Sequence, residues 1–387
     1  MSQRGESAAH AGDGRFVALD SWRGVCALLV ALYHLRIEAF VATNELVRGS
    51  YLFVDFFFVL SGFIISSVYR DRVATRSGVV EFLLKRVGRL WPVHVVTLAA
   101  MLSLMLAMSL ARHWRSSAPF EAPASVERLI ANLLLMNGWG IPGFTSINFP
   151  SWTISCELLV YALFALITFR WGRSSAAWLT MAAASAAILF FWSPRFMDVT
   201  DVLGVARCAY GFGLGVVANA VFRFWNRKGL RWATGFEWLA LAGTFAFVTL
   251  AHDSAASLLA PAVFFVVVLV FAFEAGAVSA LARSPVLKSL GTLSFTIYMC
   301  HYVVYFGVYQ VAWMLRRVGP NGIDTSGNLV GLVVAAGYLG AVVLTASCLH
   351  RWVEEPWRRR FYAAAQRCAG RFAPKTEKGR ASAGRSG

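Results

Sequence analysis

The sequence predicts an all-α membrane protein: a polytopic helical bundle with about ten transmembrane helices and both termini in the cytoplasm. Three observations carry this prediction. The 387 residues are 58% hydrophobic and only 14% charged, with a mean hydropathy of +0.60. Apolar stretches of the roughly 20 residues that a spanning helix needs recur along the chain. Lys and Arg concentrate in alternate connections between these stretches, as the positive-inside rule requires of cytoplasmic loops.

Ten apolar stretches have the length of a spanning helix, and an even number places both termini on one side of the membrane. Their approximate ranges are 18–40, 51–69, 91–111, 152–170, 176–192, 202–222, 236–251, 257–275, 291–315 and 328–350. The basic connections run from Arg70 to Arg89, from Arg223 to Arg231 and from Arg351 to Arg385. The net charge of +16 is therefore an orientation signal that also attracts anionic headgroups. No basic-aromatic motif indicates nucleic-acid binding.

The chain divides into three parts. Residues 1–15 are polar with mixed charge and form a cytoplasmic N-terminal segment, so the first helix is expected to stay as an anchor. Residues 16–362 form the transmembrane domain, and residues 363–387 form a basic tail that is expected to be disordered. The connection 112–151 contains a short apolar run, LIANLLLMNGWGIPGF, which predicts a re-entrant or interfacial segment. Six cysteines lie scattered without C-x-x-C spacing, so neither a metal site nor a disulfide framework is expected.

The first helix carries ionisable residues that usually face a protein interior and mark a functional path. Arg23 and His34 are separated by three turns, about 16 Å, and share one face. Asp20 lies near the same stripe. The alternative is that Asp20 pairs with Arg23 at the cytoplasmic end and that His34 only forms a hydrogen bond near the outer interface.

Two acidic residues are expected at the depth of His34. Asp55 interrupts the second apolar stretch, and Glu157 lies within two turns of the outer end of the fourth. A carboxylate at this depth would hold the imidazole in one tautomer and stabilise its protonated form, which is the support a general base needs. The alternative for Asp55 is an isolated carboxylate in a water-filled vestibule.

Polar residues of the ninth stretch follow a helical period. Ser294, Tyr298, His301 and Tyr305 are spaced by four, three and four residues, so they share one face. A polar stripe on a membrane helix predicts a cavity wall, and the alternative is hydrogen bonding between helices.

Three further arginines occupy informative positions. Arg86 and Arg89 lie three residues apart at the cytoplasmic start of the third stretch, where two guanidinium groups can grip phosphates. The alternative is that these cations only follow the positive-inside rule at the cytoplasmic end of a helix. Arg207 lies inside the sixth stretch and needs an acidic partner from the cavity. The nearby Gly211 and Gly215 form a G-x-x-x-G pair that permits close helix packing.

Six colinear motifs resemble those of the acyltransferase-3 family of bacterial membrane proteins. They are LDSWRG followed by His34, FVDFFFVLSGF, RVGRLWP, SWTISCELLVY, LGTLSFTIYMCHYVV and EEPWRR, and together they extend from about residue 18 to residue 360. The chain departs from the usual pattern in having SWRG where many members have Gly-Leu before Arg-Gly, and in placing Cys156 beside Glu157.

The resemblance implies an inner-membrane O-acyltransferase. Its donor would be acetyl-CoA or another acyl-CoA, with no permanently bound cofactor, and its acceptor a hydroxyl of a surface or exported glycan, such as lipopolysaccharide or exopolysaccharide, or of a lipid-linked precursor. His34 matches the family's essential His, and Arg86 and Arg89 match an RxxR associated with the acyl-CoA. Arg23 would lie along the path of the donor, and polysaccharide-assembly proteins are possible partners. Direct transfer and an acyl-histidine intermediate both remain open.

Two functions from other classes compete with the enzyme. A transporter or flippase of a glycan or lipid-linked substrate would also need a polar-lined bundle, although such proteins often show repeated halves and no repeat is evident here. A non-catalytic scaffold for polysaccharide assembly would leave the cluster of acidic residues and His without a purpose.

Overall fold

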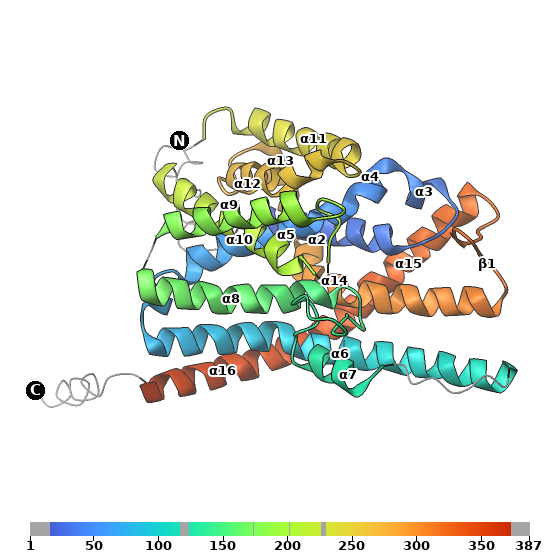
Figure 1. The fold of residues 1–387 in the computed structure, drawn as a ribbon. Coiled ribbons are helices and arrows are strands. Elements are labelled where there is room, and N and C mark those ends of the chain that lie inside the picture. Colours follow the sequence, from blue (N-terminus) through green and yellow to red (C-terminus); the bar gives the residue numbers. More distant parts are fainter. Residues whose placement is uncertain (1–15, 117–123, 173, 201, 226–229, 373–387) are drawn as a thin grey trace, which may run out of the picture.

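The computed structural model describes residues 16–116, 124–172, 174–200, 202–225 and 230–372, most of them in helices (Figure 1). The elements in chain order are α2 (Val17–His34), α3 (Phe40–Thr43), α4 (Glu45–Gly49), η1 (Ser50–Leu52), α5 (Phe53–Tyr69), η2 (Arg72–Ala74), α6 (Arg76–Ser116), α7 (Val126–Leu133), α8 (Ser151–Trp171), α9 (Ser175–Trp192), α10 (Gly204–Trp225), α11 (Ala233–Ala251), η4 (Ala255–Leu259), α12 (Ala260–Phe271), α13 (Ala277–Ala282), α14 (Pro285–Met314), β1 (Val318–Gly319), β2 (Gly322–Ile323), α15 (Asn328–Leu349), η5 (His350–Glu354) and α16 (Glu355–Phe372).

Within the described residues, seven helical segments are long and apolar enough to cross a membrane. They are Glu45–Tyr69, Arg76–Ala111, Ser151–Trp171, Ser175–Trp192, Gly204–Trp225, Ala233–Ala251 and Asn328–Phe372. The protein is therefore a helical membrane protein. The three other predicted stretches fall on α2, α12 and α14. Helix α12 has only 12 residues, and α2 and α14 carry most of the candidate site's polar side chains, which lower their hydropathy.

Two helix pairs form the centre of the bundle, and glycines bring each pair together. In α2 against α14, a Cβ added at Gly24 would lie 2.4 Å from the carbonyl carbon of Leu290, and one at Gly291 would lie 2.5 Å from the carbonyl oxygen of Asp20. In α5 against α10, a Cβ at Gly215 would lie 2.0 Å from the carbonyl oxygen of Val59. The expected close packing at the G-x-x-x-G pair is thus present, and it fixes the helices that carry the candidate site.

Helices α6, α8 and α16 lie side by side along one flank of these pairs (Figure 1). Helix α6 begins at Arg76, well before the predicted start near 91, because the basic segment packs along α16 instead of forming a loop. Residues 363–372, which the sequence analysis assigned to a disordered tail, continue α16 and pack against α6. Residues 1–15 and 373–387 lie outside the described residues.

The connection after α6 is a short helix followed by an irregular loop. Helix α7 has 8 residues, too few to span a membrane, in agreement with the expectation of a re-entrant or interfacial segment. It is fastened to α6 by two hydrogen bonds: the Trp91 indole donates to the carbonyl of Leu133 (3.0 Å), and His94 Nε2 bonds the carbonyl of Asn132 (2.7 Å). The loop then brings Phe149 into contact with His34 at the end of α2.

A small β-hairpin, β1 and β2, closes the same end of the bundle. Ile323 donates its N–H to the carbonyl of Arg36 (2.9 Å), and Glu38 donates its N–H to the carbonyl of Ile323 (3.1 Å). Gly322 has φ +135°, and a Cβ there would lie 2.5 Å from the carbonyl oxygen of Arg36, so only glycine fits. The hairpin is therefore tied to the segment that directly follows His34.

Candidate active site

Two cavities lie along α2 and α14, and each is lined by residues of both helices. The arginine cavity has a volume of about 150 Å³ and contains the residues predicted for the donor side. Its polar lining residues are Arg23, Ser61, Arg86, Arg89, Thr153, Glu157, Tyr161, Ser294 and Tyr298. The tyrosine cavity has a volume of about 460 Å³ and contains His34. It is lined by Tyr33, His34, Arg36, Phe149, Tyr302, Tyr305, Tyr309, Gly319, Pro320, Asn321 and Gly322.

His34 is the last residue of α2 and is enclosed by aromatic rings. Its ring centroid lies 4.9 Å from that of His301, 5.4 Å from that of Phe149 and 5.7 Å from that of Tyr302. Its Nδ1 lies 2.9 Å from the carbonyl oxygen of Val30, one turn earlier on α2, and 3.2 Å from His301 Nε2. Nε2 of His34 is buried and has no hydrogen-bond partner among the described residues.

The protonation of both imidazoles follows from these neighbours. A carbonyl oxygen only accepts hydrogen bonds, so His34 Nδ1 carries a proton and donates to Val30. His301 Nδ1 lies 2.7 Å from the carbonyl oxygen of Tyr298 and is protonated for the same reason. In the neutral rings, the lone pairs then reside on His301 Nε2, which faces His34, and on His34 Nε2, which is unpartnered. The arrangement leaves His34 Nε2 available as a base.

Tyr298 and His301 connect the two cavities. Tyr298 lines the arginine cavity, and its ring centroid lies 5.7 Å from that of His301. His301 is fully buried and touches His34 on the tyrosine-cavity side. Of the predicted polar stripe on α14, Ser294 and Tyr298 thus line one cavity, Tyr305 lines the other, and His301 lies in the wall between them.

Arg23 is fixed at the wall of the arginine cavity by three neighbours. Its Nε donates to Ser294 Oγ (2.7 Å), and its Nη2 lies 3.3 Å from Asp20 Oδ1 and 3.4 Å from the carbonyl oxygen of Gly291. Ser294 Oγ in turn donates to the carbonyl of Gly291 (2.8 Å). The Asp20–Arg23 pair, which was the alternative considered from the sequence, therefore forms, and the guanidinium still lines the cavity.

Arg86 has unused hydrogen-bonding capacity in the same cavity. Its Nη2 donates to the hydroxyl of Tyr69 (3.0 Å), and its guanidinium lies 5.1 Å from the Tyr69 ring centroid. Its buried Nε has no hydrogen-bond partner among the described residues. A buried donor without a partner costs about 1–3 kcal/mol, so a ligand oxygen at this point would bind favourably.

Arg89 belongs to a charged network with the C-terminal motif. It forms an ion pair with the buried carboxylate of Glu354, whose other oxygen lies 2.7 Å from His350 Nδ1. His350 and Glu354 bound η5, a π-helical turn, and such turns often occur at functional sites. In the sequence, EEPWRR was identified only as a family motif. In the structure, its Glu354 holds Arg89, one of the three arginines of this cavity.

Asp55 is the partner of Arg207 and not of His34, which corrects the expectation that Asp55 supports the imidazole. Arg207 Nε donates to Asp55 Oδ1 (3.0 Å) and Nη2 donates to Oδ2 (2.7 Å). Arg207 also donates to the carbonyls of Val199 and Tyr51, at 3.1 Å each. Both side chains are buried, at 2% exposure or less, and neither lines either of the two cavities. The acidic partner expected for Arg207 exists, but the pair joins α5 to α10.

Glu157 lines the arginine cavity, so it too lies away from the contacts of His34 described above. Its cavity neighbours include Arg86, and it interacts with Tyr161, whose hydroxyl lies 2.7 Å from Ser61 Oγ. The carboxylate therefore compensates the charge of the cavity arginines. In the described part of the chain, His301 and the carbonyl of Val30 take the place that an acidic residue was expected to take beside His34.

Of the residues that line the tyrosine cavity, only His34 and Tyr305 were identified from the sequence. The spacing of Tyr302, Tyr305 and Tyr309 by three and four residues is visible in the sequence and indicates one helix face. The sequence does not show that Phe149 and the hairpin also line this cavity, because their positions depend on contacts between residues far apart in the chain.

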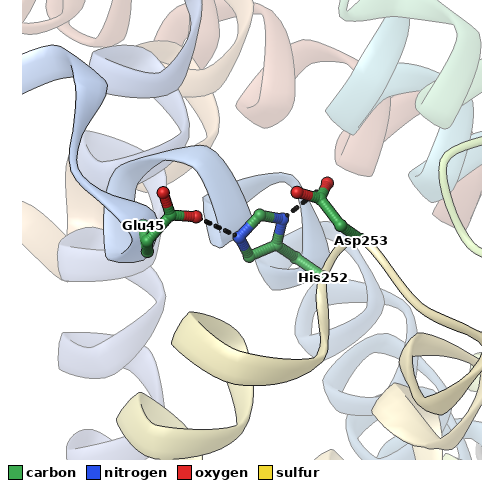
Figure 2. A group of neighbouring side chains, drawn as sticks. All are labelled: Glu45, His252 and Asp253. Carbon is green, nitrogen blue, oxygen red and sulfur yellow. Dashed lines mark hydrogen bonds and ion pairs between the residues drawn. The ribbon is translucent and has the colours of Figure 1, made fainter.

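A separate cluster of charged residues lies where α4 meets the end of α11. His252 Nε2 lies 2.9 Å from Glu45 and Nδ1 lies 2.9 Å from Asp253, and Figure 2 shows the two carboxylates on opposite edges of the ring. Arg48 pairs with both carboxylates, at 2.9 Å and 3.2 Å. One ligand atom from each of the three residues lies within 4.8 Å of the others, but each carboxylate faces a different ring nitrogen and both carboxylates are paired with Arg48. The cluster therefore acts as an electrostatic clamp between α4 and α11.

The family model and one of the two relatives name the same chemical class, acyl transfer. Residues 16–350 match the acyltransferase-3 family model, described as "Acyltransferase domain". The chain is 28% identical to Acyltransferase MdmB of Streptomyces mycarofaciens over 93% of this chain and 97% of that protein. It is also 30% identical to Protein 2 in picA locus of Rhizobium radiobacter, over 47% of this chain and 96% of that protein. No solved structure gave a significant match.

Proposed function

This chain belongs to the acyltransferase-3 family and is an acyltransferase, and from that premise we propose that it moves an acyl group, typically acetyl from acetyl-CoA, onto a hydroxyl of a cell-surface or exported glycan or its lipid-linked precursor. The observation that carries the proposal is that His34 lines a cavity and has a buried Nε2 without a hydrogen-bond partner among the described residues, while its other nitrogen is fixed by Val30 and His301. This is the geometry of a general base.

The donor enters from the cytoplasm, through the arginine cavity. Arg86 and Arg89 face the phosphates of the acyl-CoA, and the free Nε of Arg86 supplies a hydrogen-bond donor to it. A cavity of about 150 Å³ is too small for a whole acyl-CoA, so the adenosine remains at the mouth while the phosphates lie at Arg86 and Arg89. Arg23 and Tyr298 line the way from there toward His301 and His34.

The transfer step uses His34 twice. Nε2 takes the proton of the acceptor hydroxyl while its oxygen attacks the thioester carbonyl, so that the C–O bond forms and the C–S bond breaks. The protonated imidazole then returns the proton to the departing CoA thiolate. The protein lies in a bacterial inner membrane with ten spans and both termini in the cytoplasm, which places the tyrosine cavity on the outer side.

His34→Ala tests the proposal. Since a general base contributes about 10²–10⁴ in rate, we expect glycan acetylation to fall below detection while the protein remains in the membrane fraction. Proton NMR of surface polysaccharide from strains carrying each variant measures the acetyl signal. Normal acetylation by His34→Ala would remove this residue from the mechanism. Loss of polymer export along with the acetyl signal would instead indicate a flippase.

A further inference from the structure

The tyrosine cavity contains a ladder of three rings on one face of α14. The ring centroids of Tyr302 and Tyr305 are 5.6 Å apart, and those of Tyr305 and Tyr309 are 6.0 Å apart. The ladder starts beside the catalytic candidate, because the Tyr302 centroid lies 5.7 Å from that of His34. Phe149 extends it from the other side, 5.6 Å from Tyr302.

The polar groups of the cavity are also available to a ligand. Within the described part of the chain, no hydrogen bond occupies the hydroxyls of Tyr302, Tyr305 or Tyr309. Arg36 adds an exposed guanidinium, and the tip of the hairpin, Gly319 to Gly322, adds backbone groups. At about 460 Å³ the cavity falls within the range of roughly 300–1,000 Å³ typical of small-molecule sites.

These features of the cavity fit a ligand ring that combines apolar faces with many hydroxyl groups. The face of a phenol ring carries partial negative charge and attracts the partly positive C–H groups of a sugar ring. The phenol hydroxyls, Arg36 and the backbone of the hairpin can bond the sugar hydroxyls. A lipid chain would fit better in the neighbouring hollow, which is lined largely by aliphatic residues such as Val304, Val311 and Val334.

We propose that the tyrosine cavity is the acceptor subsite, in which Tyr302, Tyr305 and Tyr309 stack a sugar ring so that one of its hydroxyls meets His34 Nε2. The inference rests on the proposed acyl transfer and names the residues that select its acceptor. Because the ladder leads away from His34, further sugars of a chain would follow Tyr305 and Tyr309 toward the hairpin.

The test uses the purified full-length protein in nanodiscs, with radioactive acetyl-CoA as donor and a panel of methyl glycosides as acceptor probes. Tyr302→Ala, Tyr305→Ala and Tyr309→Ala should each raise the KM for the methyl glycoside about tenfold, as expected for the loss of one stacked aromatic contact. The KM for acetyl-CoA should stay within about twofold. Tyr302→Phe keeps the ring and should stay within about threefold of the wild type for the glycoside.

Phe306→Leu is the matched control, since this residue lies on α14 but does not line the tyrosine cavity. It packs against Leu98 and Met101, in an apolar cluster that Tyr302 also borders. Its KM for the glycoside should equal that of the wild type. Tyr305 is the more buried residue, so Tyr305→Ala can fail to fold. In that case the glycoside KM of Tyr309→Ala still tests the subsite. An unchanged glycoside KM in the Ala variants, or an equal rise in the KM for acetyl-CoA, would overturn the subsite.

A sugar-specific failure can be told apart from failure of the proposed function. If the wild type acetylates aliphatic alcohols and no glycoside, the sugar subsite is wrong while acyl transfer stands. If neither class of acceptor is used and thiol release from acetyl-CoA is the same in wild type and His34→Ala, the proposed function itself is wrong.

Discussion

The two nitrogens of His34 have different surroundings, and His301 helps to determine what each can do. His301 donates from Nδ1 to Tyr298 and presents its Nε2 lone pair to His34 Nδ1. Together with the carbonyl of Val30, it favours the His34 tautomer that keeps Nε2 free of a proton. In the proposed reaction, His301 is therefore a positioning residue that acts through His34.

Substitution of His301 should separate positioning from packing. His301→Ala should lower kcat by about 10²-fold, because the His34 ring can then turn and change tautomer. His301→Asn should recover most of the rate, since an amide can donate to Tyr298 and accept from His34 at similar positions. Steady-state kinetics with saturating acetyl-CoA measures both. Equal loss in the two variants, with correctly folded protein, would mean that the residue only fills space.

Among the elements, α5 and α10 depend on the buried Asp55–Arg207 pair. Removing one member of such a pair leaves an uncompensated buried charge and costs about 3–5 kcal/mol. We therefore expect Asp55→Asn to lower the yield of folded protein sharply, while the folded fraction keeps most of its specific activity. Fluorescence-detected size exclusion and a per-molecule activity assay provide the two measurements.

A double variant distinguishes a structural pair from a catalytic one. Asp55→Leu combined with Arg207→Met replaces both charges by apolar groups and should fold better than Asp55→Leu alone. The double variant should also be active. If Asp55→Asn protein folds but is inactive, Asp55 has a catalytic role, as predicted from the sequence.

The positions of most helices were predictable from apolar length, whereas their ends were set by packing. The predicted stretches 152–170 and 176–192 differ from α8 and α9 by one residue at most. Helix α6 starts at Arg76 and α16 continues to Phe372 because these two basic, amphipathic segments pack against each other. Hydropathy alone assigns such segments to loops or tails.

Within the candidate site, the sequence indicated which motif residues share a cavity, but not the direction in which Asp55 points. Asp55 was expected near the level of His34, but the close packing of α5 on α10 turns it toward Arg207. Arg86, Arg89, Ser294 and Tyr298 share one cavity, as the motif spacing indicated. The neighbours of His34 could not be read from the sequence, because they depend on how far α2 and α14 rotate toward each other.

At the scale of the whole molecule, the site has two sides with different chemistry. Positive charge gathers in the arginine cavity, and phenol rings gather in the tyrosine cavity, with Tyr298 and His301 in between. In the proposed function the donor is an acyl-CoA, which is highly charged and does not cross a bilayer, so we expect it to reach the arginine cavity from the cytoplasm. We expect the acceptor to reach the tyrosine cavity from the opposite side.

Sealed membrane vesicles of known orientation test this sidedness. With radioactive acetyl-CoA added outside, inside-out vesicles should acetylate glycan, and right-side-out vesicles should incorporate at least tenfold less because the donor cannot reach Arg86 and Arg89. Permeabilising both preparations with mild detergent should make their rates equal, which controls for enzyme content. Arg86→Gln should raise the KM for acetyl-CoA about tenfold in inside-out vesicles, since one charge-assisted contact contributes about 1.5–3 kcal/mol. Equal incorporation by the two intact preparations would mean that both substrates enter from one side, and the division of the molecule into a donor half and an acceptor half would then be wrong.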